Sequence, residues 1–164
     1  MRVSTEAQHD EIIIRAAETF RLDANLLRAL MAIESSGGEC YKPRLEPSYN
    51  YLYHPDIYCD KLGITRATED CLQRMSWGPL QIMGAVAREM GFESDIPMLT
   101  HPDIAIFYAS KYLRYLSDRC DDEEHLIAAY NGGLGVSKTV GGMWRNQTYV
   151  DKVYRELRRL RALK

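Results

Sequence analysis

The chain has 164 residues, of which 46% are hydrophobic and 27% are charged, the proportions of an ordinary globular protein. This length suits a single domain with its own hydrophobic core, so we expect residues 1–164 to form one domain. The net charge of −2 argues against nucleic acid as the main partner, because phosphate binding usually needs an excess of basic residues. No apolar run is long enough to cross a membrane, and we expect a monomer that does not insert into one.

Helical signals dominate the chain. They predict helices over about 5–20, 24–36, 66–74 and 79–90, from 100–103 to about 118, over 123–130, and from 149 nearly to the last residue. Asp23 is a good N-cap, Gly37 and Gly38 stop the second helix, and Pro79 suits a helical first turn. No alternating stretch is long enough to predict a strand. The expected fold class is therefore all-α, with a mainly helical α+β fold as the alternative.

Residues 39–75 are predicted to be an irregular insertion that is rich in tyrosine and proline. Its sequence includes the stretch YKPRLEPSYNYLYHPDIYCDKLG, and the short helix over 66–74 closes it. The insertion directly follows the second helix, so it must leave the protein near the end of that helix.

Four cysteines, Cys40, Cys59, Cys71 and Cys120, are irregularly spaced and form no CxxC pair. Three of them lie in one segment together with His54, which leaves free thiols, a disulfide and a zinc site as alternatives. The zinc site is the least favoured because structural zinc sites usually show close ligand pairs. We expect neither a metal nor an organic cofactor. From residue 145 onward, seven basic residues stand against two acidic ones, which indicates either a solvated final helix or attraction to an anionic polymer.

An acidic residue stands where the helical pattern predicts an apolar one. Leu27, Leu30 and Met31 have the spacing of one buried helical stripe, and seven residues after Leu27 the same stripe reaches Glu34. The Glu34 carboxylate is either turned into solvent at the helix end or held in a partly dry cleft. In the second case desolvation raises its pKa.

Three further segments combine polar, aromatic and glycine residues in unusual ways. They are SWGPLQIM with Gln81, AAYNGG with Tyr130 and Asn131, and QTYVDKVY with Tyr149. Taken singly, each has an ordinary explanation, such as helix capping for Gln81 and core packing for the tyrosines. Their occurrence together, in this order, is more specific.

In this order the segments resemble the soluble-type lytic transglycosylases, which are relatives of goose-type lysozyme. Glu34-Ser35 matches the Glu-Ser pair that ends a helix in that family. The segments 78–82 and 129–133 match its GLMQI and AYNAG motifs, and Tyr149 matches a tyrosine that opens a late helix. The resemblance covers about residues 22–154 and implies a lysozyme-like fold. Two features depart from the family pattern: Pro79 replaces the usual leucine, and the insertion is much longer than the usual loop.

The resemblance implies that the protein cleaves peptidoglycan glycan strands with one carboxyl group. Glu34 would protonate the β-1,4 glycosidic oxygen between N-acetylmuramic acid and N-acetylglucosamine, and would then take the proton of the muramic C6 hydroxyl. The products would be 1,6-anhydro ends, formed without water. The implied substrate-binding residues are Ser35, Gln81, Tyr130, Asn131 and Tyr149. Glu46, within the insertion, is either a second active-site carboxylate or, by default, a surface glutamate.

Two rival functions stay open. A hydrolase of the same fold, a lysozyme or a chitin-cleaving enzyme, would use water and would be favoured by a working Glu46 or by another acid across the cleft. A non-catalytic cell-wall or virion module would not cleave at all. We also expect the insertion to border the substrate groove, where four tyrosines either extend the sugar platform or pack the insertion onto the body (Tyr49, Tyr51, Tyr53 and Tyr58). The first twenty residues lack the apolar core of a secretory signal. This is typical of a bacteriolytic phage endolysin or a mobile-element enzyme that reaches the cell wall through a holin, a secretion machine or a virion.

Overall fold

The described part of the chain is mainly helical. The structure, a computed structural model, describes residues 5–39 and 42–163. Its elements are α1 (Thr5–Phe20), α2 (Ala24–Ser35), β1 (Arg44–Leu45), α3 (Pro55–Leu62), α4 (Arg66–Gln73), β2 (Met75–Trp77), β3 (Ile82–Met83), α5 (Gly84–Glu89), the 3-10 helix η1 (Ile96–Thr100), α6 (Pro102–Ser117), α7 (Glu123–Gly132) and α8 (Gln147–Ala162). The expected helical class is confirmed. Within the described residues, no helix is both long and apolar enough to cross a membrane.

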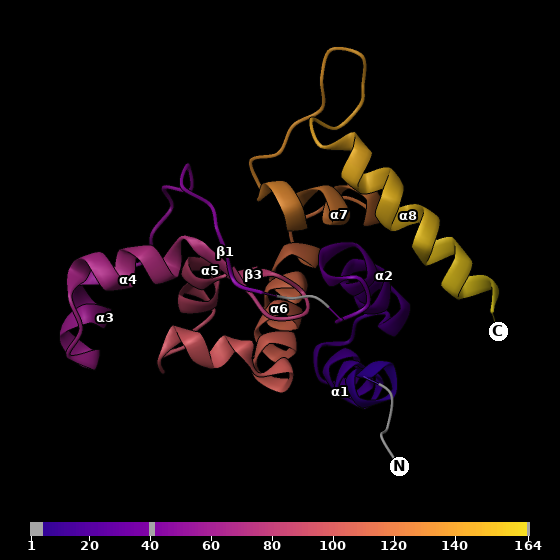
Figure 1. Ribbon diagram of the computed structural model, residues 1–164. Coiled ribbons are helices and arrows are strands. Elements are labelled where there is room, and N and C mark those ends of the chain that lie inside the picture. Colours follow the sequence, from indigo (N-terminus) through magenta and orange to yellow (C-terminus); the bar gives the residue numbers. More distant parts are fainter. Residues whose placement is uncertain (1–4, 40–41, 164) are drawn as a thin grey trace.

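Helix α6 runs through the middle of the molecule and carries much of the core (Figure 1). It packs against α1 and α7 and also contacts α5 and η1. Ile106, Ala109 and Leu113 are fully buried, at the spacing of one helical face. A Cβ atom added to Gly78 would lie 2.3 Å from the Cβ atom of Ala105. The backbone of the β2–β3 connection therefore rests directly on α6.

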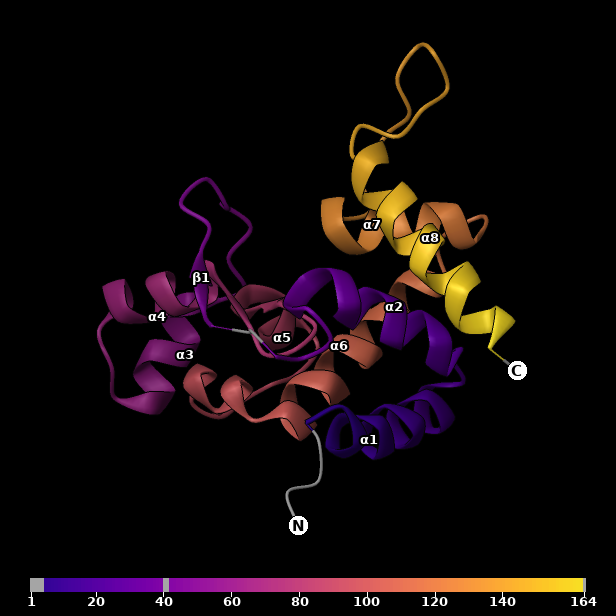
Figure 2. The same cartoon turned by 45° about the vertical axis from the view of Figure 1, so that its right-hand side comes forward.

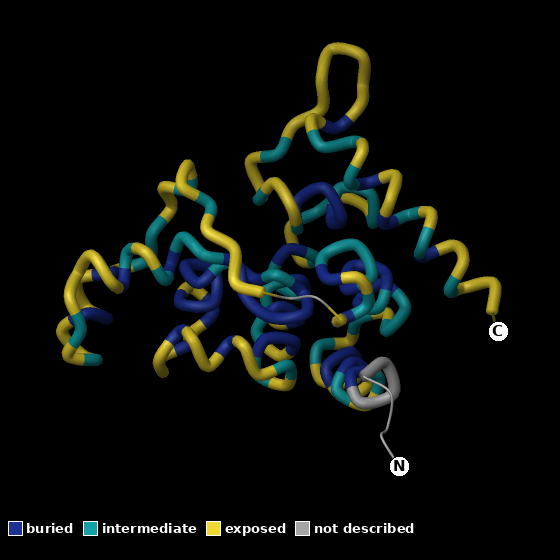
Figure 3. The backbone as a smooth tube through the Cα atoms, viewed as in Figure 1, coloured by how far each residue is buried: buried dark blue, intermediate teal, exposed yellow. Residues whose placement is uncertain are grey.

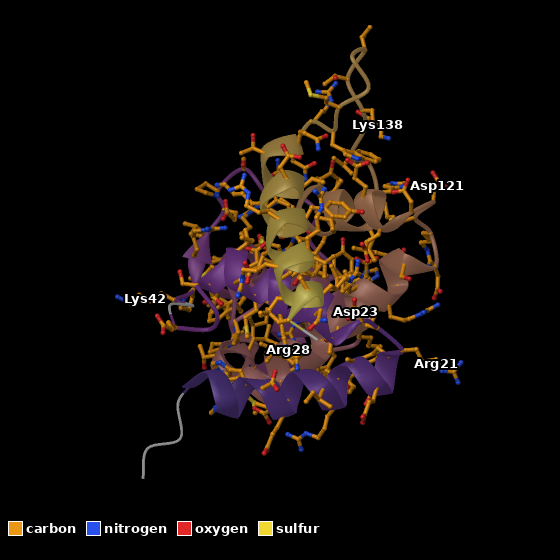
Figure 4. The ribbon with its side chains drawn as sticks, turned by 90° about the vertical axis from the view of Figure 1, so that its right-hand side faces the viewer. Arg21, Asp23, Arg28, Lys42, Asp121 and Lys138 are labelled. Carbon is orange, nitrogen blue, oxygen red and sulfur yellow. The ribbon has the colours of Figure 1, made fainter. Side chains whose placement is uncertain are left out.

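Helices α2 and α8 lie against each other, and α8 also crosses α7 (Figure 2). Arg161 of α8 pairs with Asp23 and with Glu123, each at 2.7 Å. As expected, Asp23 caps α2 by accepting a hydrogen bond from the backbone N–H of Asn25. Figure 4 shows Asp23 beside the C-terminal turns of α8. Because this end of α8 meets the start of α2, the first turn of α8 lies near the last turn of α2.

Three short antiparallel strands form a sheet in the order β1-β2-β3. Strands β2 and β3 make a hairpin with Trp77 opposite Ile82. The Gln81 N–H closes the connecting turn by donating to the carbonyl of Gly78 at 3.0 Å. The predicted helix over 79–90 is therefore wrong at its start, and Pro79 lies in this turn. The φ angles of Gly78 (70°) and Gln81 (48°) are left-handed, which a right-handed helix cannot include. Proline is favourable at the second position of a turn as well as in the first turn of a helix. Its presence in the sequence therefore could not distinguish a hairpin turn from the start of a helix.

The insertion contains one helix that the sequence analysis did not predict. Helix α3 begins with Pro55 in its first turn and ends at Gly63, whose φ is 66°. These are ordinary helix signals, but the segment between them is only eight residues long and shows no clear apolar stripe. The predicted helix α4 is confirmed. The remaining predicted helices are confirmed to within about two residues at each end.

A fully buried ion pair fastens the insertion to the body. Arg88 of α5 donates to both carboxylate oxygens of Glu69 in α4, at 2.8 and 3.1 Å, and neither side chain is exposed. Arg88 also donates to the carbonyls of Phe92 and Ser94, at 2.8 and 2.7 Å. The ring of Tyr58 lies over its guanidinium group, 4.2 Å from ring centre to Cζ. The polar atoms of this pair are thus satisfied without water.

Gln73 of α4 extends this network to the loop that precedes α3. Its side chain donates to Glu69 at 2.9 Å and to the carbonyl of Tyr53 at 3.0 Å. It also accepts a hydrogen bond from the Tyr53 N–H at 2.7 Å. The amide thus holds both backbone groups of one loop residue, and through Glu69 and Arg88 it links the insertion to the core.

The buried pair predicts a large stability effect. Glu69→Gln leaves Arg88 charged and buried without a counter-ion, and we expect it to cost about 3–5 kcal/mol of the free energy of unfolding. Urea denaturation followed by circular dichroism measures this difference.

The matched control is Glu93→Gln, because Glu93 pairs with Lys61 at 2.6 Å on the surface. Removal of an exposed ion pair should lower the free energy of unfolding by less than about 1 kcal/mol. Equal losses in the two variants would contradict the anchoring role of the buried pair.

Candidate active site

One groove of about 810 Å³ gathers residues from most of the segments singled out in the sequence. It is lined by the end of α2, the segment 44–51, the β2–β3 hairpin, α5, α6, and the end of α7 with the loop that follows. Figure 3 shows that the loops after β1 and after α7 are largely exposed, whereas α6 alternates between buried residues and intermediate or exposed ones. The predicted position of the insertion beside the groove is confirmed. A second hollow of about 630 Å³, between α4 and η1, contains none of the predicted site residues.

Glu34 lies in the last turn of α2, half-buried, and lines the groove. Burial raises the pKa of its carboxyl group, which is the outcome expected of the second alternative, a carboxylate held in a partly dry cleft. Two interactions oppose this rise: the Tyr149 hydroxyl donates to Oε1 at 2.6 Å, and the positive charge of Arg44 favours the ionised form. A carboxyl group with a raised pKa and a donor that stabilises its ionised form is suited both to release and to recover a proton.

Tyr149 supports Glu34 from the first turn of α8 and is not among the residues that line the groove. Burial and the adjacent Glu34 raise its pKa well above the usual value, so the hydroxyl remains a donor. Tyr130, at the end of α7, lines the groove, and its hydroxyl donates to the carbonyl of Leu80 at 2.7 Å. Of the two tyrosines, Tyr149 therefore orients the acid, and Tyr130 holds α7 against the hairpin turn.

Ser35 lies beneath the groove and has only 2% of its surface exposed. Its hydroxyl lies 2.6 Å from the carbonyl of Pro79 and 3.1 Å from that of Met31, and it accepts a hydrogen bond from the Gly38 N–H at 3.0 Å. Ser35 thus joins the end of α2 to the hairpin turn. This placement favours a positioning role over the direct substrate contact that the resemblance implies.

Gln81 lines the groove from the hairpin turn, with a backbone conformation that is unusual for a residue with a side chain. Its amide donates to the carbonyl of Gly78 at 3.0 Å and accepts a hydrogen bond from the Ser76 hydroxyl at 2.9 Å. The side chain is thereby fixed before any ligand arrives. Backbone strain of this kind gathers at functional sites.

Asn131 is exposed at the end of α7 and lines the groove from that helix, whereas Gln81 lines it from the hairpin turn. Its side-chain oxygen accepts a hydrogen bond from Asn146 at 3.0 Å, and the same Asn146 amide donates to the carbonyl of Ala128 at 2.9 Å. The hydrogen bond from Asn146 thus holds the side chain of Asn131 at the groove wall. Asn146 is a supporting residue that the sequence analysis did not single out.

The insertion contributes charged residues to the groove. Glu46 lines it, as expected of an active-site carboxylate, but Arg44 donates to Glu46 at 2.7 Å. Arg44 therefore interacts with Glu34 and with Glu46 at once. The sequence analysis missed Arg44, as well as Glu89 of α5 and Tyr112 and Tyr115 of α6, because isolated charges and helical tyrosines carry no spacing signal.

The four tyrosines of the insertion divide between the two expected roles. Tyr49 and Tyr51 line the groove, with their ring centres 5.9 Å apart. Tyr53 is held by Gln73 through its backbone, and Tyr58 packs on Arg88. The first pair is available to a ligand, and the second pair attaches the insertion to the body.

The cysteines form no metal site in the described part of the chain. Cys59, Cys71 and Cys120 are free thiols, and Cys40 lies outside the described residues. Within residues 5–39 and 42–163, no three histidine, cysteine or acidic side chains gather closely enough to hold a metal ion.

The raised pKa of Glu34 predicts how stability depends on pH. Between the ordinary pKa of 4.5 and the raised folded value, the folded state binds more protons than the unfolded state, so the wild type loses stability as pH rises. The Glu34→Gln variant should not lose stability in this way, because a glutamine side chain does not titrate. We expect its melting temperature to exceed that of the wild type by about 2–4 °C at neutral pH and by less at acidic pH.

Differential scanning calorimetry across this range measures the effect, with Glu11→Gln on the exposed face of α1 as the control. A stability difference that does not change with pH would show that Glu34 titrates as an ordinary surface glutamate.

Comparison with known proteins agrees with this geometry. The family model described as the transglycosylase SLT domain matches residues 11–149, which include Glu34, the hairpin turn, Asn131 and Tyr149. Neither a curated protein nor a solved structure matches the chain at a significant level. Because the matched region is most of the chain, the lysozyme-like fold expected from the sequence is confirmed. The chain belongs to the SLT-domain transglycosylases, a family of lytic enzymes that act on the peptidoglycan of the cell wall.

Proposed function

We propose that the protein cleaves the β-1,4 bond between N-acetylmuramic acid and N-acetylglucosamine and leaves 1,6-anhydro ends. The observation that carries this proposal is the half-buried Glu34, which has a raised pKa and a tyrosine donor on one oxygen. Most glycosidases use two carboxyl groups, and in this groove the carboxylate of Glu46 is already ion-paired with Arg44. One carboxyl group that both gives and takes a proton fits an internal displacement better than the activation of water.

The reaction begins with proton transfer from Glu34 to the glycosidic oxygen, and the bond from this oxygen to the muramic anomeric carbon breaks. The substrate's own acetamido group stabilises the positive charge that develops on that carbon. Glu34 is now ionised, and the hydrogen bond from Tyr149 and the charge of Arg44 stabilise it in this state. The carboxylate then removes the proton of the C6 hydroxyl, whose oxygen bonds to the anomeric carbon. Glu34 ends the cycle protonated, so the step needs no co-reactant.

The other groove residues suit the binding of a glycan. Gln81 and Asn131 place fixed amide groups on opposite walls for hydroxyl or acetamido groups of the sugar. The rings of Tyr130, Tyr49 and Tyr51 offer flat apolar surfaces to sugar rings. Ser35 and Tyr149 act from beneath by holding α2 and the acid in place. The phage or mobile-element setting and the monomeric state stay predictions.

The proposed reaction predicts specific products. Purified peptidoglycan incubated with the protein should release 1,6-anhydromuramyl fragments, detected by mass spectrometry, and EDTA should not change the rate. Glu34→Gln should lower the rate at least about a hundredfold, the lower range for loss of a general acid, while circular dichroism shows an intact fold.

The same measurement separates the rival functions. Reducing ends in place of anhydro ends, lost in Glu46→Gln, would establish a hydrolase that uses Glu46 as its second carboxylate. Absence of any cleavage would leave a wall-binding or virion module.

The contact between Tyr149 and Glu34 predicts a shift in pH dependence. The hydrogen bond from Tyr149 lowers the pKa of Glu34, so Tyr149→Phe should move the limb of the pH–rate profile governed by Glu34 to higher pH. The rate at neutral pH should fall about tenfold or more, because the ionised carboxylate loses a charge-assisted hydrogen bond.

Tyr130→Phe is the matched control, because its hydroxyl is bonded to the carbonyl of Leu80. It should lower stability and leave the pH limb in place. An equal shift in both variants would mean that the direct contact is not the cause.

A further inference from the structure

Glu89, the last residue of α5, lines the groove and has no bonded partner among the residues that the structure describes. It lines the same groove as Glu34 and is exposed. Glu34 accepts a hydrogen bond from Tyr149, and Glu46 pairs with Arg44. Within residues 5–39 and 42–163, no side chain forms a hydrogen bond or an ion pair with the carboxylate of Glu89. At its α5 side the groove therefore carries a carboxylate that no described residue pairs with.

Two tyrosines, Tyr49 and Tyr112, line the groove together with this carboxylate. Burial first, and then the charge of Glu89, raise the pKa of Tyr49 to about 12. Glu89 also contributes to the raised pKa of Tyr112, after burial and Tyr49. Both phenols therefore feel the charge of Glu89, and their raised pKa values keep them neutral at physiological pH. Both rings line the groove.

The aromatic cluster already carries one cation. The rings of Tyr112 and Tyr115 are stacked, with centres 6.2 Å apart and planes 16° apart. The guanidinium group of Arg119 lies 3.7 Å from the ring centre of Tyr115. Stacked rings of this kind attract cations through their electron-rich faces. Tyr49 and Tyr112 line the groove together with Glu89, and among the described residues no cation lies over either of their rings.

A carboxylate without a partner beside neutral aromatic faces suits a small organic cation. A divalent metal ion would need several oxygen ligands, and no cluster of three ligands exists in the described part of the chain. We propose that Glu89, with the rings of Tyr49 and Tyr112, forms a subsite for a primary ammonium group of the peptidoglycan substrate. This inference rests on the proposed function for the identity of the polymer.

Peptidoglycan can supply a primary ammonium group from two sources. One is the side-chain amine of the diamino acid in a stem peptide that is not cross-linked, and the other is the sugar amine of a de-N-acetylated glucosamine. Cross-linking or acetylation converts either amine into a neutral amide and removes its charge. The subsite would therefore direct the enzyme toward strands that carry free amines.

The first experiment compares cleavage of matched substrates. Peptidoglycan with free stem-peptide amines is tested beside the same material after acetylation, and a second pair of glycans differs only in de-N-acetylation of glucosamine. The wild type should favour one free-amine substrate by about three- to tenfold in kcat/KM, mainly through KM, as expected for one partly exposed charged contact. The preferred pair identifies the source of the amine. The preference should shrink as salt is raised, because salt screens exposed charges.

Glu89→Gln should abolish this preference by slowing cleavage of the free-amine substrate to the rate of the acetylated one. Glu11→Gln on α1 makes the same change of charge away from the groove and should keep the preference. A wild type without preference would overturn the proposal. So would an equal loss on both substrates in Glu89→Gln, which would mean that the carboxylate binds neutral hydroxyl groups.

A binding measurement separates this proposal from the proposed function. Calorimetric titration of the full chain uses a short lysine-containing peptide with blocked ends, a chitosan oligosaccharide, and the N-acetylated form of each. Tighter binding of a free-amine probe that Glu89→Gln removes would support the subsite even if the protein cleaves no glycan. Equal binding of all probes by the wild type would overturn the subsite even if anhydro products form.

Discussion

The active site depends on the hydrogen bonds that two helices donate to the buried turn of the β2–β3 hairpin. The turn residues Pro79 and Leu80 are buried, so their carbonyl groups must find donors within the protein. Ser35 at the end of α2 reaches the carbonyl of Pro79, and Tyr130 at the end of α7 donates to that of Leu80. Ser35 directly follows Glu34 in the chain, and Tyr130 directly precedes Asn131. Each donor is thus next to a residue that lines the groove. The turn therefore fixes the separation of the two walls, and Gly78, packed on Ala105, fixes the turn against α6.

This arrangement explains why the three segments occur together in the sequence. A serine after the glutamate, a tyrosine before the asparagine, and a tight turn with two buried carbonyls are parts of one hydrogen-bonded unit. Loss of any donor would leave a buried carbonyl unsatisfied, at a cost of about 1–3 kcal/mol, and would release one wall of the groove. Glu34 and Asn131 can then face the groove because their neighbours hold the backbone. The last helix completes the unit by bringing Tyr149 to the carboxyl group of Glu34.

The sequence predicted those parts of the structure that local rules determine. The Asp23 cap, the limits of α1, α2, α4 and α6, and the raised pKa of Glu34 all follow from spacing and capping, and the structure agrees. The helix predicted from Pro79 failed because proline suits two structures, and the choice between them is made by the contact of Gly78 with α6. The role of Ser35 also lay outside local rules, because its partner Pro79 is 44 residues away. Arg44 and Glu89 could not be found from spacing, since they reach the groove only through the folding of the insertion and α5 around it.

The insertion shows how a long irregular segment can form a precise wall. Its residues from 44 to 51 line the groove but belong to no helix, and two-residue strand β1 alone would hold them weakly. Further constraints come from the other end of the insertion. Arg74 donates to the carbonyl of Tyr49 at 3.1 Å, and its own carbonyl accepts from the Glu46 N–H at 2.9 Å. Gln73 bonds to both backbone groups of Tyr53 and to Glu69. An apolar contact could bury as much surface, but it would not fix the direction of the Tyr53 backbone, because apolar packing is not directional. The buried pair of Glu69 and Arg88 therefore helps to position the groove wall although neither side chain belongs to that wall. It holds α4 on α5, and α4 holds the loop that carries Glu46, Tyr49 and Tyr51 to the site of Glu34.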